Sequence, residues 1–155
     1  PLPTELFEAD GERLRERGVE FGATTGRPRR CGWLDAVQLR RAVMVNGITG
    51  MIITKPDVLS GFKSVKICTA YEIDGQRVER FPTRVALLEK AIPLYEEMPG
   101  WSEDLAACRS WDQFPENARR YFQRMEQLSG APIKIVSVGP GREDTIVCAD
   151  PFGAK

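Results

Sequence analysis

The sequence contains no histidine among its 155 residues. This absence excludes histidine-based catalytic triads, histidine general bases and histidine metal ligands from the chain. Basic charge is not in excess either, because 22 Lys and Arg residues balance 22 Asp and Glu residues. Binding DNA or RNA through general electrostatics requires a basic surplus, so no nucleic-acid partner is expected.

Paired cysteines and long apolar runs are also missing. No two of the four cysteines form a CxxC motif, which disfavours a thiolate zinc site or a redox dithiol, and no metal site is expected. The longest apolar runs, such as residues 51–53, are too short to span a bilayer. A chain of this size can bury an adequate core without disulfides. We therefore expect one soluble, cytoplasmic domain over residues 1–155, with reduced thiols and no membrane partner.

The pattern of apolar residues, glycines and prolines predicts an α/β fold with a β-hairpin excursion. Proline at the first turn and glycine after the last turn delimit the clearest helix, residues 115–129. Other helices are expected over residues 4–18, with an interruption near Gly11, and over residues 34–46 and 85–92. Strands are expected over residues 50–54, which read as buried, 65–73, 77–81, 133–138 and 145–149, with Asp74 and Gly75 as the hairpin turn.

The segment of residues 22–30, GATTGRPRR, combines hydroxyls, glycines and arginines in a loop. Arginine offers a planar fork that matches carboxylate and phosphate, and Gly26 lets the backbone approach a ligand closely. These features predict an anion-binding loop. An equally weighted alternative is an exposed loop whose arginines pair with the acidic residues nearby.

A second candidate site follows the predicted strand of residues 50–54, where Lys55, Pro56 and Asp57 stand. In open α/β sheets, ligands bind beyond the carboxyl ends of the strands. A carboxylate there can accept hydrogen bonds from N1–H and the amino group of guanine, and adenine would leave it unpaired. The simpler alternative is a strand end that carries a surface ion pair.

A third candidate is the strand end at Ser137, Val138 and Gly139, followed by Pro140 and Gly141. The glycines would let backbone face a ligand, but the GxG fragment lacks the rest of a dinucleotide-binding fingerprint. Taken alone, this segment reads as a turn. Together with the other two segments it indicates a ligand of nucleotide size.

Read together, these segments resemble the C-terminal part of adenylosuccinate synthetase. The resemblance covers essentially the whole chain in the order of the family. It rests on five motifs and a DPF triplet near the end: GATTGRPRRCGWLD (22–35), NGITGMIITKPDVLSGF (46–62), YEEMPGW (95–101), PENARRY (115–121) and SVGPGREDTI (137–146).

The resemblance implies a ligase of purine nucleotide biosynthesis, which joins IMP and L-aspartate with hydrolysis of GTP and needs Mg²⁺. It also implies a large, mostly parallel sheet domain of the P-loop NTPase type and a homodimer. By this resemblance, L-aspartate would bind the loop of Ala23, Thr24, Thr25, Gly26, Arg27, Pro28 and Arg29, with Arg27 also reaching IMP and Arg29 also reaching GTP. GTP would further bind Lys55, Pro56, Asp57, Ser137, Val138 and Gly139, with Asp57 as the guanine-specificity residue.

The chain departs from the family pattern at two positions and lacks the catalytic region. Pro56 stands where the family commonly has Leu, and Gly141 where it commonly has Asp. The phosphate loop, the catalytic Asp and His and the metal ligands of the family belong to an N-terminal region not present here. No catalytic residue is therefore expected in this chain, and it should be inactive alone. Because the sequence begins at Pro1, we expect a piece of a longer ligase; the alternative is a stand-alone, non-catalytic guanine-nucleotide-binding module.

Overall fold

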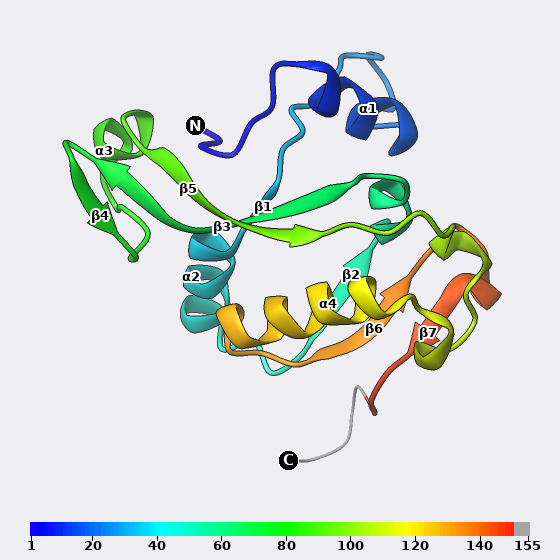
Figure 1. Ribbon diagram of the computed structural model, residues 1–155. Coiled ribbons are helices and arrows are strands. Elements are labelled where there is room, and N and C mark those ends of the chain that lie inside the picture. The colour runs from blue at the N-terminus through cyan, green and yellow to red at the C-terminus, as the bar shows by residue number, and fades with distance from the viewer. Residues whose placement is uncertain (151–155) are drawn as a thin grey trace. The chain divides into compact units, whose positions relative to one another are not determined.

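The computed structural model describes residues 1–150, so the last two positions of the DPF triplet, Pro151 and Phe152, lie outside the described residues. The chain, whose ribbon is drawn in Figure 1, divides into two compact units by its internal contacts. Unit 1 comprises Pro1–Gln38 and Lys66–Glu97, whereas unit 2 comprises Leu39–Val65 and Met98–Lys155.

The first sheet, most of which lies in unit 1, is organised around β3 (Ser64–Ile73). β1 (Leu34–Asp35) lies parallel to β3, β4 (Gln76–Val78) returns antiparallel to it, and β5 (Ile92–Pro99) also pairs with it. The turn residues Asp74 and Gly75 have φ values of 50° and 78°. Two positive φ angles are the geometry of a two-residue hairpin turn that matches the strand twist. The predicted hairpin is confirmed, with a shorter second strand.

Two helices of unit 1 correct the sequence-based expectations. α1 (Ala9–Arg17) runs through Gly11 without interruption, so the predicted break there is wrong. A Cβ at Gly11 would lie 2.1 Å from the backbone oxygen of Leu6, so the glycine serves close packing rather than a turn. α3 (Val85–Glu89) is shorter than predicted, and β5 follows it. The prolines of residues 92–99 obscured that strand, because proline donates no ladder hydrogen bond.

The sheet of unit 2 has the order β2-β6-β7. β2 (Met51–Thr54) lies parallel to β6 (Ile133–Ser137), and β7 (Thr145–Val147) lies antiparallel to β6. The predicted strands are confirmed, but β2 is not buried as expected, because Ile52 is 62% exposed. The α/β class is also confirmed, and both sheets of residues 1–150 are mixed.

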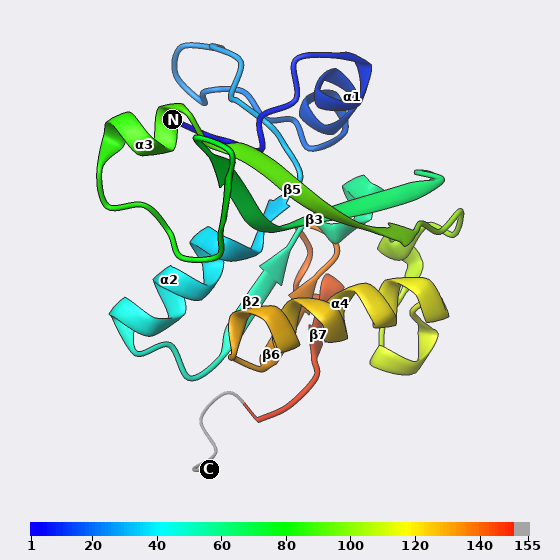
Figure 2. The same cartoon turned by 60° about the vertical axis from the view of Figure 1, so that its left-hand side comes forward.

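The helices of unit 2 follow the predicted start and stop signals. α4 (Glu116–Ser129) starts after Pro115, ends at Gly130 with φ 81°, and runs beside β6 (Figure 1, Figure 2). Its buried face carries Phe122, whose ring lies 5.4 Å from that of Phe114. α2 (Ala36–Asn46), most of which belongs to this unit, begins two residues later than predicted. Short 3₁₀ helices complete unit 2: η1 (Pro56–Leu59), η2 (Leu105–Ala107), η3 (Trp111–Gln113) and η4 (Arg142–Asp144).

Candidate functional site

The carboxyl ends of β2 and β6 bring two of the three predicted segments together. The strands are parallel, and beyond a register shift between Met51 and Ile52 they place Thr54 opposite Ser137. Immediately beyond them, the backbone N–H of Lys55 donates to the carbonyl oxygen of Ser137 at 2.9 Å. The segment of residues 55–57 and the segment of residues 137–139 therefore leave the sheet at the same edge, where ligands of α/β folds bind.

The chain turns sharply at Lys55, directly after β2. Lys55 has φ 57° and ψ 38°, a left-handed conformation that is unfavourable for a residue with a side chain. Pro56 is buried at the first position of η1, where its missing N–H is not needed. The Lys55 side chain is exposed, whereas Asp57 is half-buried with its Oδ1 atom buried. The turn thus presents an ammonium and a carboxylate two residues apart.

The loop after β6 is closed by hydrogen bonds to Asp144. The N–H of the buried Val138 donates to the Asp144 carbonyl oxygen at 2.9 Å, and the Asp144 N–H donates to the Gly141 carbonyl oxygen at 3.1 Å. The Gly141 N–H donates to Asp144 Oδ2 at 2.8 Å. A Cβ at Gly139 would lie 2.4 Å from the same Oδ2, so the carboxylate occupies the space that a side chain there would need. Ser137 Oγ donates to the Gly139 carbonyl oxygen at 3.1 Å.

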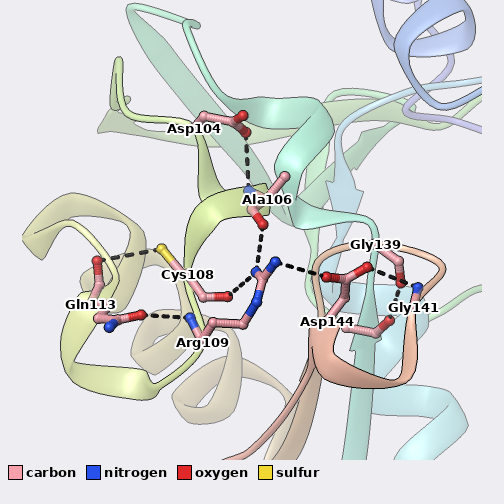
Figure 3. Close-up of polar contacts among 9 residues, drawn as sticks. Asp104, Ala106, Cys108, Arg109, Gln113, Gly139, Gly141 and Asp144 are labelled. Atoms are coloured by element: carbon pink, nitrogen blue, oxygen red, sulfur yellow. Dashed lines mark hydrogen bonds and ion pairs between the residues drawn. The ribbon is translucent and has the colours of Figure 1, made fainter.

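Arg109 makes a network of polar contacts that no motif of the sequence indicated, and Figure 3 shows it in close-up. Its Nη1 donates to the carbonyl oxygens of Ala106, at 2.7 Å, and Cys108, at 2.8 Å. Its Nη2 lies 3.2 Å from Asp144 Oδ1. The Arg109 N–H donates to Gln113 Oε1 at 2.6 Å. Burial raises the pKa of the adjacent Cys108 thiol, the charge of Asp104 adds to this, and the Arg109 charge opposes it.

The third predicted segment lies in unit 1 as an exposed loop. Residues 23–30 are all exposed, and they include the predicted Ala23, Thr24, Thr25, Gly26, Arg27, Pro28 and Arg29. The loop is closed by the Gly22 N–H, which donates to the Arg27 carbonyl oxygen at 2.8 Å, and by the Gly26 N–H, which donates to the Gly22 carbonyl oxygen at 2.8 Å. Gly26 has φ 63°, which explains the glycine there.

Ion pairs with nearby acids engage two arginines next to this loop's tip. Arg29 Nη1 lies 3.0 Å from Glu20 Oε2, and Arg30 Nη1 lies 3.4 Å from Glu5 Oε2. The Arg29 carbonyl oxygen also accepts from Arg15 Nε at 3.0 Å. The alternative of surface ion pairing therefore describes part of this segment. Both arginine side chains are exposed, at 59% and 60%, although their carboxylate partners are more covered, so an anion can reach the two guanidiniums.

Among residues 1–150, no group of three or more His, Cys, Asp or Glu residues is arranged to hold a metal ion. All four cysteines are free thiols. Within the same residues, no helix combines the length and the apolar character needed to cross a membrane.

The two mixed sheets and their helices define a chain of the α/β class, with a candidate ligand site at the paired strand ends. A sequence profile described as adenylosuccinate synthetase matches residues 1–146. The adenylosuccinate synthetases of Trichlorobacter lovleyi and Desulfatibacillum aliphaticivorans are 54% identical over 153 residues and 57% identical over 152 residues. The structure of the fully ligated adenylosuccinate synthetase from Plasmodium falciparum is similar, with a TM-score of 0.90 and 40% identity over 95% of this chain.

The chain belongs to the adenylosuccinate synthetase family. The two bacterial matches cover 99% and 98% of the chain, but the chain spans only 36% and 35% of those relatives. It likewise spans 36% of the Plasmodium falciparum structure.

Proposed function

We propose that this chain supplies the guanine pocket and the aspartate-binding loop of a ligase that forms adenylosuccinate from IMP and L-aspartate with hydrolysis of GTP. The observation that carries the proposal is the meeting of two segments, residues 55–57 and 137–139, at one edge of a parallel strand pair. The match of residues 1–146 to the family profile supports the same function.

Asp57 is the proposed guanine reader of the strand-end pocket. Its carboxylate would accept hydrogen bonds from N1–H and the 2-amino group of guanine, a pair of donors that adenine lacks. The aliphatic part of Lys55 would lie along the base while the ammonium stays solvated. Ser137, Val138 and Gly139 would line the other side with backbone. Because Pro56 has no N–H, the turn offers one donor fewer to the nucleotide than a leucine there would.

The exposed loop is the proposed site for L-aspartate. Thr24 and Thr25 would donate hydroxyl hydrogen bonds to its carboxylates, and Arg27 and Arg29 would bind carboxylate through their guanidinium forks. Arg27 would also contact IMP, and Arg29 would also contact GTP. Since Arg29 is paired with Glu20, binding would exchange one exposed ion pair for another.

The residues present do not fit a magnesium site, because the described part of the chain contains no cluster of candidate ligands. No catalytic step is therefore derived through Mg²⁺. Since the resemblance assigns the catalytic Asp and His of the family to another region, we expect no turnover from the 155 residues alone. The proposal includes the homodimer and the cytoplasmic location of the enzyme, and the four free thiols agree with a reducing compartment.

Calorimetry with GDP, ADP and xanthosine diphosphate tests the proposal on this chain and on a full-length synthetase carrying it. We expect the wild type to prefer GDP over ADP by at least about tenfold. Asp57→Asn should weaken the binding of GDP and strengthen the binding of xanthosine diphosphate, since the amide N–H can donate to the 2-oxygen of xanthine. Asp112→Asn, at an exposed position of η3, is the matched control. Equal binding of GDP and ADP by the full-length protein would refute the guanine pocket.

A further inference from the structure

Arg109 lies outside every segment that the sequence singled out. It stands between η2 and η3, and its guanidinium joins two backbone carbonyls of that region to the loop after β6 (Figure 3). The Arg109 side chain is 46% exposed, whereas its partner Asp144 is only 16% exposed. A mostly buried carboxylate needs its partners more than an exposed one does, because fewer waters can replace them.

Asp144 determines the path of the loop that follows β6. Its Oδ2 accepts from the Gly141 N–H and fills the space beside Gly139, while its carbonyl oxygen accepts from the Val138 N–H. The other carboxylate oxygen, Oδ1, faces Arg109 Nη2. The carboxylate therefore has one oxygen committed to the loop and one to Arg109, which leaves it little freedom to rotate.

We propose that Arg109 is a positioning residue for nucleotide binding: by holding the Asp144 carboxylate, it pre-forms the Val138–Gly139 backbone that faces the guanine base. The inference rests on the proposed function, since it assigns that backbone to the GTP pocket. Arg109 itself touches no substrate in this role. It raises the affinity for the nucleotide because the loop is already ordered before binding, so binding does not have to offset the entropy cost of ordering it.

The geometry also explains why arginine is needed at this position. One guanidinium places Nη1 on two carbonyl oxygens and Nη2 on a carboxylate at the same time. A lysine ammonium is a single point charge and cannot span the three acceptors in that arrangement. Arg109→Lys therefore keeps the charge but loses the coupling of η2 to the loop.

Steady-state kinetics of a full-length synthetase carrying this chain tests the proposal. Arg109→Ala should raise KM for GTP by about threefold to tenfold and leave kcat and KM for L-aspartate within about twofold. Arg109→Lys should give a KM for GTP between those of the wild type and Arg109→Ala. Arg120→Ala removes an exposed arginine–carboxylate pair of α4, with Glu116 at 2.5 Å, and serves as the matched control. Combining Arg109→Ala with Asp144→Asn should add little to either change, because the two residues act as one unit.

Amide hydrogen exchange without nucleotide gives a second readout. The Val138 and Gly141 amides should exchange faster in the Arg109 variants and be unchanged in Arg120→Ala. The inference is overturned if KM for GTP does not change in Arg109→Ala, or if the KM values for all substrates rise together while the stability of the protein falls. If Arg109→Ala does not fold, Arg109→Lys decides by the same criteria. A wild-type enzyme without guanine preference would instead refute the proposed function, so the two failures are distinguishable.

Discussion

The Tyr71 hydroxyl donates to Asp35 Oδ2 at 2.5 Å inside unit 1. The other oxygen of the same carboxylate, Oδ1, accepts from the Gln38 N–H at 3.0 Å, so Asp35 caps the first turn of α2. Both side chains are buried. One carboxylate therefore links the C-terminal part of β3 to the start of a helix that comes 25 or more residues earlier in the chain.

Tyr71→Phe should lower the free energy of unfolding by about 1–3 kcal/mol, because it leaves a buried carboxylate oxygen without its hydroxyl donor. Urea denaturation of the chain measures the loss. Tyr95→Phe is the control, since it removes another hydroxyl from the same core cluster and leaves the Asp35–Tyr71 bond in place. Equal losses in the two variants would contradict the importance of this bond.

Gly11→Ala should destabilise the chain by about 1–3 kcal/mol, although glycine to alanine inside a helix is ordinarily stabilising. The new Cβ would lie 2.1 Å from the Leu6 carbonyl oxygen, so the backbone would have to move. Thermal and urea unfolding measure the change. The exposed Glu12→Ala, one position later in α1, should stay within about 0.5 kcal/mol of the wild type. A stabilised Gly11→Ala variant would show that the Leu6 contact is not formed.

Lys55→Gly should be more stable than Lys55→Ala by up to about 1 kcal/mol, because only glycine adopts φ 57° without a steric penalty. Both variants remove the same side chain, so both should lose affinity for GDP to a similar extent. Comparing their urea midpoints separates the backbone conformation from the side-chain contact. An alanine variant at least as stable as the glycine variant would mean that the left-handed turn is not retained.

The stability of the chain should fall as pH rises above about 9. Burial raises the pKa of Cys68 from 9.0 to about 12 and the pKa of Tyr95 from 10.0 to about 12, and the charge of Asp35 acts in the same direction. The folded state then holds protons that the unfolded state releases, so this stabilisation is complete below pH 9 and lost as pH approaches 12.

Urea midpoints measured between pH 8 and 11 test this dependence. Cys68→Ala should flatten the curve above pH 9, because it removes one of the groups that titrate only after unfolding. Alkylation at pH 8 gives an independent check: Cys68, which is fully buried, should react much more slowly than the partly exposed Cys31. Comparable alkylation rates would contradict the burial of Cys68.

Several elements could be predicted from the sequence because their signals are local. Pro115 and Gly130 bracket α4, and Asp74 and Gly75 mark the hairpin turn, since each of these residues restricts or frees its own backbone. β5 could not be predicted in the same way. Its prolines argue against a strand, and only pairing with β3 reveals one.

For the candidate site too, local sequence signals indicated some features and only the tertiary structure showed others. The residue types of the three segments, residues 22–30, 55–57 and 137–139, together indicated a ligand of nucleotide size, and the motifs indicated the family. Both inferences depend only on residue types and their spacing, which the sequence contains. That Lys55 hydrogen bonds to Ser137, and that Arg109 holds Asp144, was decided only by the tertiary structure. The reason is physical: strand register and contacts between residues far apart in the chain depend on how the core packs, and no local preference of one segment specifies its distant partner.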